Sequence, residues 1–134
     1  MIVDSYAWVE FLTAGPRGST VRERLESPGE LVTPDIVLAE VARVFARQGM
    51  KRAQVEGHLR SIGALSTVLP VSVEIALGVD EADKDLREGA RRRKDESPSF
   101  ADGVILSFAR HLRGRLLTGD PHFYGMPETD WIGR

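Results

Sequence analysis

The sequence predicts an α/β fold in which a small, mostly parallel sheet is flanked by helices on both faces. Three observations support this prediction. Short apolar runs typical of strands recur along the chain, segments with apolar residues at helical spacing separate them, and no repeat or linker interrupts the alternation. Such alternation is typical of parallel strands joined by helical crossovers. In sheets of this kind, ligands bind beyond the carboxyl ends of the strands.

The length and composition predict one domain over residues 1–134. Of these residues, 42% are hydrophobic and 28% are charged. The net charge of −2 gives no overall attraction to nucleic acid, so a polyanion would need local basic patches. The lack of cysteine excludes disulfides, thiolate metal ligands and a cysteine nucleophile. Because neither a membrane-spanning run nor a signal-peptide pattern occurs, we expect a soluble, cytoplasmic protein.

Turn-forming residues and changes of periodicity divide the chain into elements. Apolar runs bounded by Asp, Pro or Gly predict strands, at 1–3, 31–32, 67–71, 115–118 and, as an edge strand, 130–132. Helical spacing predicts helices, at 5–12, 19–26, 34–48, 51–64, 72–77, 80–96 and 98–113.

The first expected strand ends at Asp4, directly before the helix over 5–12. Capping preferences favour Asp4 as the N-cap of that helix. The end of an apolar strand is also a place for a functional carboxylate, and the two roles are compatible.

The third expected helix carries a second candidate carboxylate. Thr33 is its expected N-cap and Pro34 its first residue. On a helical wheel, Glu40 lies opposite the apolar face, in line with Arg43 and Arg47. Periodicity alone therefore makes Glu40 a solvated residue in a row of salt bridges.

The segment from Asp80 to Glu96 is dense in charge of both signs. Such a segment is usually a solvated helix, and the basic run at 91–94 also complements a helix C-terminus. A patch that contacts phosphate groups is the alternative. The residues alone leave both interpretations open.

The helix expected to begin at Pro98, with Ser97 as its N-cap, contains an isolated carboxylate, Asp102. Apolar residues from Phe100 to Leu112 form one broad stripe, and Asp102 lies at its edge. The helix dipole stabilises a carboxylate in the first two turns, which is one explanation for Asp102. A functional role would require partners elsewhere in the chain.

Asp120 follows the strand over 115–118, much as Asp4 follows the first strand. Because the carboxyl ends of parallel strands meet at one edge, we expect both side chains there. Carboxylates gathered at one edge raise one another's pKa unless a cation neutralises them. This edge is therefore a candidate cation site.

Oxygen ligands without cysteine or paired histidines point to one or two Mg²⁺ or Mn²⁺ ions. Such ions activate water and stabilise charge on a phosphodiester, so the natural enzyme class is a metal-dependent nuclease or phosphatase. His122 could serve as a ligand or base, although a lone histidine in a loop is more often structural.

The candidate acids lie in four stretches that read IVDSYAWVEFL, TPDIVLAEVARVF, SPSFADGVILSFA and LLTGDPHF. In this order and at these separations, they resemble the four acidic motifs of PIN-domain ribonucleases, specifically of VapC-type toxins. The resemblance spans nearly the whole chain. It implies a PIN-like three-layer α/β/α fold. It also implies a catalytic, metal-binding quartet with two supporting polar residues, namely Asp4, Glu40, Asp102 and Asp120 with Ser5 and Thr118.

The resemblance further implies a Mg²⁺- or Mn²⁺-dependent endoribonuclease from a toxin–antitoxin pair. Such a toxin is homodimeric and is inhibited by a small VapB-type antitoxin in the active-site groove. In this setting Glu40 belongs to the rim of the site, and we expect Arg43 and Arg47 to contact phosphate or an antitoxin. One departure concerns His122, because many relatives carry a further acid there. Occupancy of a second metal position is therefore open.

Two other functions are compatible with parts of the sequence. A PIN-like module could bind RNA or a protein without cutting, although all four acids are retained. A phosphotransfer fold also places Asp at strand ends with Mg²⁺. However, Tyr6 stands where a phosphatase signature needs a second acid, and no Lys follows a late strand as in a receiver domain.

Overall fold

The computed structural model describes residues 1–134 and contains one five-stranded sheet with the order β3-β2-β1-β4-β5. All neighbouring strands pair in parallel. The strands are β1 (Ile2–Val3), β2 (Val32–Pro34), β3 (Thr67–Leu69), β4 (Leu116–Thr118) and β5 (Thr129–Trp131). The predicted α/β fold class, with a small parallel sheet flanked by helices, is confirmed.

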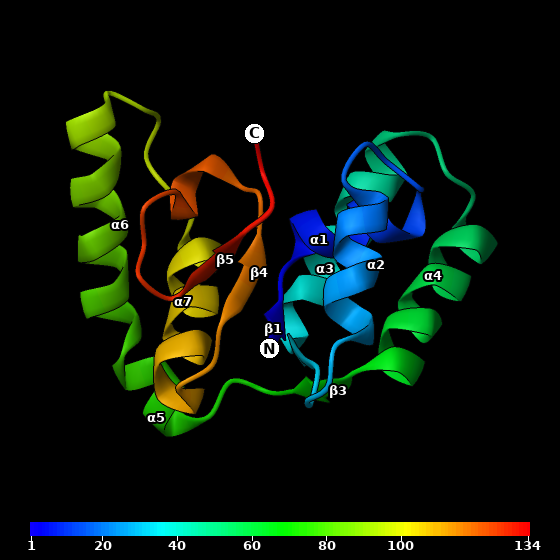
Figure 1. The fold of residues 1–134 in the computed structure, drawn as a ribbon, viewed down its shortest axis with the longest axis horizontal. Helices are drawn as coiled ribbons and strands as arrows, with labels where there is room; N and C mark the ends of the chain where they lie inside the picture. The colour runs from blue at the N-terminus through cyan, green and yellow to red at the C-terminus, as the bar shows by residue number, and fades with distance from the viewer.

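Helices fill the connections between the strands. They are α1 (Ser5–Leu12), α2 (Gly18–Glu26), α3 (Asp35–Arg47), α4 (Arg52–Leu65), α5 (Val73–Leu77), α6 (Val79–Arg93) and α7 (Phe100–Leu112), with the short 3₁₀ helix η1 (Pro121–Phe123) after β4. Figure 1 shows the sheet between two groups of helices, α1 to α4 on the right and α5 to α7 on the left. None of the helices combines the length and apolarity needed to cross a membrane.

The predicted start of the third helix is wrong. Pro34 lies in β2, where it is in register with Leu69 of β3, and α3 begins at Asp35. Thr33 does not cap the helix; its hydroxyl instead accepts a hydrogen bond from the indole nitrogen of Trp8 at 3.0 Å. The residue before a proline favours extended backbone, so Thr33 continues the strand.

The predicted start of the last long helix is wrong for the same reason. The residue before Pro98 disfavours helical backbone, residues 95–99 form no helix, and α7 begins at Phe100 with Ser99 rather than Ser97 as its N-cap. The Ser99 hydroxyl accepts a hydrogen bond from the Asp102 backbone N–H at 3.2 Å. In return, Asp102 Oδ2 accepts one from the Ser99 N–H at 2.8 Å. This capping box satisfies two backbone donors and fixes the Asp102 carboxylate.

Helix α7 forms much of the core, because residues 102–109 are all buried. Phe100 and Leu112, which were expected in its apolar stripe, are 74% and 38% exposed at its two ends. The main apolar cluster joins α7 to the sheet and to α1 and α3, and it includes the fully buried Trp8, Phe45 and Phe123.

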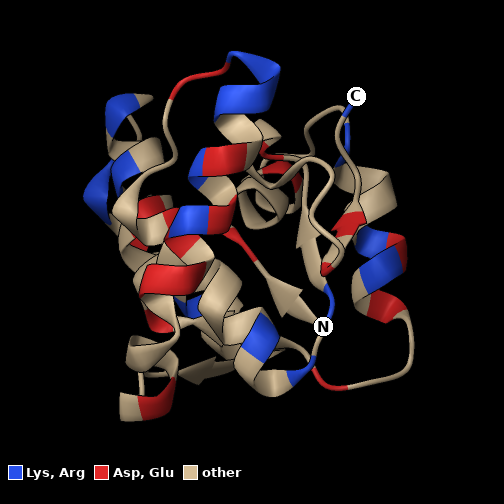
Figure 2. Cartoon of the chain, turned by 90° about the vertical axis from the view of Figure 1, so that its left-hand side faces the viewer, with Lys and Arg blue, Asp and Glu red and all other residues tan.

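Most of the charged segment at 80–96 forms helix α6 on the outside of the molecule, as the prediction of a solvated helix requires, but the helix ends at Arg93 rather than Glu96. Figure 2 faces this side and shows acidic and basic residues alternating along the helix. Lys84 and Arg87 pair with Asp80 and Asp83, one turn earlier, at 3.0 and 2.8 Å. The opposite face of α6 packs on α7.

Candidate active site

Asp4 is buried directly after β1, and both of its oxygens accept hydrogen bonds. Oδ1 accepts from the Ala7 backbone N–H at 3.0 Å, which makes Asp4 the N-cap of α1. Oδ2 accepts from the hydroxyl of Thr118, at the end of β4. Burial raises the pKa of Asp4 to about 8 despite these hydrogen bonds, and the neighbouring Asp120 and Glu40 raise it further. The predicted capping role is confirmed, and the carboxylate also faces the other acids.

Thr118 connects Asp4 to Asp120. Its hydroxyl oxygen, which donates to Asp4, also accepts a hydrogen bond from the Asp120 backbone N–H at 3.0 Å. The strand β1 lies beside β4, so the two acids that follow these strands are held at the same sheet edge. The expectation from the parallel pattern is confirmed.

Asp102, Asp120 and His122 form the tightest cluster of candidate ligands. His122 Nδ1 lies 3.2 Å from Asp102 Oδ2 and 3.3 Å from Asp120 Oδ1. Ligand atoms of all three residues lie within 4.8 Å of one another. Burial raises the pKa of Asp102, and the charge of Asp120 adds to this effect, whereas the Ser99 backbone and His122 oppose it.

His122 is the residue that sequence reasoning underrated. It lies in η1, where its backbone N–H donates to Asp120 Oδ1 at 3.0 Å. The turn places the His122 side chain beside that of Asp120. In the sequence, the position of His122 two residues after Asp120 is the feature that could have predicted this proximity.

Glu40 lies half-buried in the second turn of α3, so its interpretation as a solvated residue is wrong. Its Oε1 atom is buried and has no hydrogen-bond partner. Burial raises the pKa of Glu40 to about 7, and Asp102 and Asp120 contribute to the increase. Ser5 and Arg43 act in the opposite direction. Asp102 and Asp120 come from other segments of the chain, and a helical wheel of α3 alone does not include such neighbours.

The two arginines of the same helical row differ in their relation to the acids. Arg43 is exposed but close enough to Glu40 to lower its pKa. Arg47 is exposed one turn further along α3. The structure therefore places Arg43 beside the acids and Arg47 on the adjacent surface.

These residues fit a hard divalent cation. Carboxylate oxygens dominate the donor set, and they come from four separate segments of the chain. The raised pKa values of Asp4, Glu40 and Asp102 reflect burial and mutual repulsion, both of which a cation would offset. The buried Glu40 oxygen lacks any partner in the protein. The site is therefore chemically suited to Mg²⁺ or Mn²⁺.

Several solved structures share this fold. A toxin–antitoxin complex from Klebsiella pneumoniae is 19% identical, with a TM-score of 0.67 over 96% of this chain and 93% of that one. VapBC2 from Rickettsia felis, solved with a promoter DNA fragment, is 18% identical, with a TM-score of 0.69 over 99% and 96%. VapC20 from Mycobacterium tuberculosis, described as a toxin that cleaves the sarcin-ricin loop, is 22% identical, with a TM-score of 0.59 over 89% and 90%.

No curated protein matches the chain significantly. The family description of the PIN domain, however, matches residues 1–128. That range contains all four acids and His122 together with most of the sheet. The chain belongs to the PIN domain family.

Proposed function

We propose that this protein is a metal-dependent endoribonuclease and the toxin of a VapBC-type toxin–antitoxin pair, with residues 1–134 forming a single PIN-like domain. The convergence of Asp4, Glu40, Asp102 and Asp120 at one edge of the sheet is the observation that carries the proposal. The toxin complexes and the RNA-cleaving toxin of similar fold support it.

The four acids take distinct roles in this proposal. Asp4, Asp102 and Asp120 would hold Mg²⁺ or Mn²⁺, and Glu40 would hold a second ion or orient water through its free Oε1. When bound, the metal would supply Lewis acidity that activates water and stabilises charge on the phosphodiester. Water would attack phosphorus in line with the departing oxygen, so that one phosphorus–oxygen bond forms, the opposite one breaks, and the released oxygen takes up the proton lost by the water.

Neighbouring polar groups position these acids. The Thr118 hydroxyl and the Ala7 N–H fix the two oxygens of Asp4, and the Ser99 N–H fixes one oxygen of Asp102. Ser5 acts on Glu40. Ligands locked in this way lose little freedom when a cation binds, which favours a defined geometry.

Arginines of α3 are proposed to guide the polyanion. Arg43 lies beside Glu40, and Arg47 extends the basic row away from the acids. Both could contact phosphate groups of RNA, or acidic groups of a VapB-type antitoxin in the same groove. A homodimer is part of the same proposal.

The test is cleavage of mixed-sequence RNA by the purified protein with Mg²⁺ or Mn²⁺. We expect EDTA to stop cleavage and Asp102→Asn to lower its rate by at least about a hundredfold, because a charged ligand is lost from the reaction centre. Asp80→Asn is the matched control, since Asp80 is exposed on α6 and pairs only with Lys84. Full activity of a folded Asp102→Asn protein would remove Asp102 from the mechanism.

A PIN-like module that binds RNA or a protein without cutting is the competing function. It would be indicated if the folded wild-type protein bound RNA and the metal but cleaved nothing across a broad set of RNAs.

A further inference from the structure

The imidazole of His122 is the only candidate nitrogen ligand beside Asp102 and Asp120. The chain has three histidines. His58 packs against the Phe45 ring, with centroids 5.0 Å apart. His111 lies near the end of α7, in a hollow shared with Glu74 and Glu81. Only His122 has a ring nitrogen beside Asp102 and Asp120.

The separations of the donor atoms suit a single ion. Around an octahedral ion with ligands about 2.1 Å away, adjacent donors lie about 3 Å apart and opposite donors about 4.2 Å apart. His122 Nδ1 lies 3.2 and 3.3 Å from the carboxylate oxygens of Asp102 and Asp120. All the donor atoms lie within 4.8 Å of one another, so one cation can contact all three groups after a small rearrangement.

Hydrogen bonds hold the backbone of the turn that carries His122. The His122 N–H donates to Asp120 Oδ1 at 3.0 Å, and the Pro121 carbonyl accepts from Arg93 Nη2 at 3.3 Å. The side chain of His122 is only 27% exposed. The turn that presents His122 to the acids is thus braced before any ligand binds, which limits the rearrangement that coordination would need.

We propose that His122 is a nitrogen ligand of the metal centre and that it shifts the preference of this centre from Mg²⁺ toward Mn²⁺. Mg²⁺ favours all-oxygen ligands, whereas an imidazole favours first-row transition metals. An acid at the same position would complete an oxygen-only site. The inference deepens the proposed nuclease function and rests on the same carboxylates.

The experiment measures metal binding without RNA. Wild-type protein, His122→Asp and His111→Gln are titrated with Mn²⁺ and with Mg²⁺ by calorimetry, and bound Mn²⁺ is examined by pulsed EPR for coupling to a ligand nitrogen. We expect nitrogen coupling in the wild type and in His111→Gln, but not in His122→Asp. The preference for Mn²⁺ over Mg²⁺ should fall at least about tenfold in His122→Asp, since even changes to groups around a ligand have effects of this size.

The wild-type spectrum decides the question even if His122→Asp folds poorly. Bound Mn²⁺ without nitrogen coupling, an unchanged metal preference in folded His122→Asp, or no Mn²⁺ binding by the wild type would each overturn the inference. Nitrogen-coupled Mn²⁺ in a protein that cuts no RNA would support the inference while counting against the nuclease function. The two failures can therefore be distinguished.

Discussion

Asp4 shows how one residue can have a structural and a chemical role at once. Its carboxylate caps α1 through Ala7 and contacts Thr118 across the sheet. The capping role could be predicted from the sequence because it depends on adjacent residues. The contact with Thr118 could be predicted only as far as the parallel pattern brings two strand ends together.

The burial of Asp4 predicts how stability depends on pH when a chelator removes metal ions. The folded state holds a proton on Asp4 up to a pKa of about 8, whereas the unfolded state releases it near 3.8. The folded state therefore binds more protons between these values, and the free energy of unfolding should fall as pH rises through this range. Glu40, with a pKa of about 7, contributes in the same direction.

Asp4→Asn should make this decline shallower, because it removes the group with the larger shift. Urea unfolding at several pH values with a chelator present measures the slope. An equally steep decline in the variant would show that Asp4 ionises freely in the folded protein.

The capping box of α7 gives a second prediction for a single residue. Ser99→Ala should lower the free energy of unfolding by about 1 kcal/mol, because the Asp102 N–H loses its acceptor. Ser97→Ala is the matched control and should change stability little, since Ser97 is exposed and precedes the helix. Thermal or urea unfolding distinguishes the two serines; a larger loss in Ser97→Ala would place the cap where the sequence pattern first suggested.

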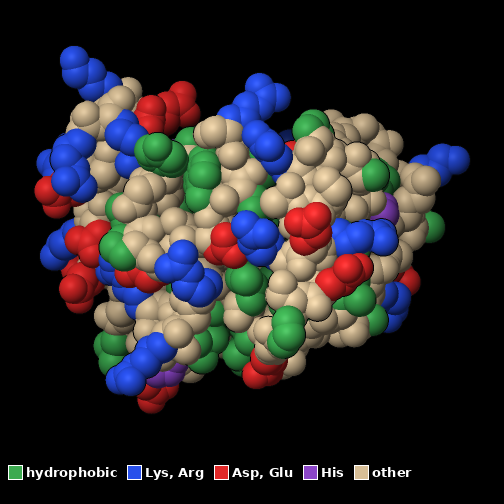
Figure 3. Space-filling model, viewed as in Figure 1, with side chains coloured by type: hydrophobic (Ala, Val, Ile, Leu, Met, Phe, Trp, Pro, Cys, Tyr) green, Lys and Arg blue, Asp and Glu red, His purple; other side chains and the backbone are tan.

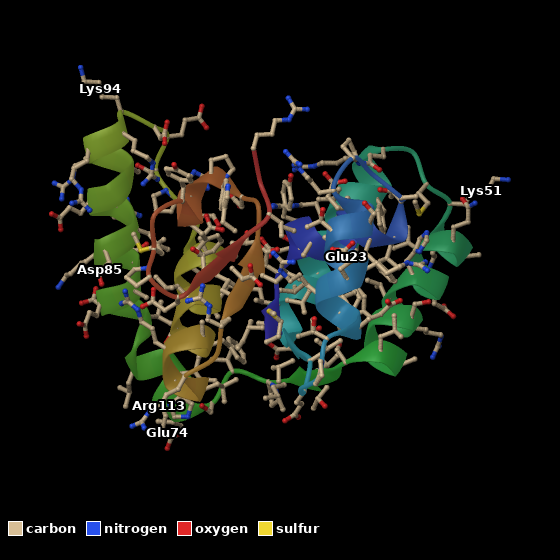
Figure 4. All side chains as sticks on the ribbon, in the orientation of Figure 1. Glu23, Lys51, Glu74, Asp85, Lys94 and Arg113 are labelled. Carbon is tan, nitrogen blue, oxygen red and sulfur yellow. The ribbon has the colours of Figure 1, made fainter.

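At the scale of elements, helix α6 holds the turn that carries His122. Arg93 donates to the carbonyls of Tyr124 and Pro121 at 3.2 and 3.3 Å, and it pairs with Asp95 at 2.9 Å. The same helix end carries other basic residues that point outward, and Figure 4 shows Lys94 extending away from the molecule. The charged segment is thus a solvated helix that also braces the candidate site.

Arg93→Ala should lower the affinity for Mn²⁺ by about tenfold, because η1 and the residue after it, Tyr124, each lose a hydrogen bond that steadies the turn beside Asp120. Arg92→Ala removes an exposed charge from the same turn and should leave metal affinity nearly unchanged. Calorimetric titration of both variants measures the difference. Equal affinities would mean that η1 keeps its shape without Arg93.

The order and type of the elements could be predicted from periodicity, but two helix starts could not. A serine or threonine before a proline resembles an N-cap followed by a first helical residue. The same pair also favours extended backbone, and in this protein Pro34 joins β2 while Pro98 precedes α7. Strand pairing and packing with distant segments decide whether the proline begins a helix or continues extended backbone. The residues next to the proline do not reveal those distant contacts.

Across the whole molecule, charges of both signs are mixed. Figure 3 shows acidic and basic side chains interspersed over one face, in keeping with the net charge of −2. If RNA is the substrate, as proposed, its attraction must depend on local arginines rather than on an overall field. A helical wheel could not predict the position of Glu40 among other acids either. Glu40 lies in α3, whereas Asp102 lies in α7 and Asp120 follows β4, so their proximity depends on the tertiary fold.

Arg43 and Arg47 should account for part of the salt dependence of RNA binding. The affinity is measured in an Asp102→Asn background, which should not cleave the RNA. Changing both arginines to Ala should reduce the magnitude of the slope of log affinity against log salt by about 1.4, because each phosphate contact on a single strand contributes about 0.7. Arg113→Gln is the control, since Arg113 follows α7 at the end opposite Asp102 (Figure 4). An unchanged slope in the double variant would exclude both arginines from the RNA path.

The position of β1 between β2 and β4 has a consequence for the order in which the protein becomes active. Asp4 follows the first strand of the sheet, whereas its partner Thr118 lies 114 positions later in the chain. Until β4 is available, β1 lacks one neighbour in the sheet and Asp4 lacks Thr118, and Asp120 and His122 come later still in the chain. A growing chain therefore cannot assemble the site before β4 and the turn after it have been made. With the proposed nuclease function, the chain would stay harmless to its own message until that point of its synthesis.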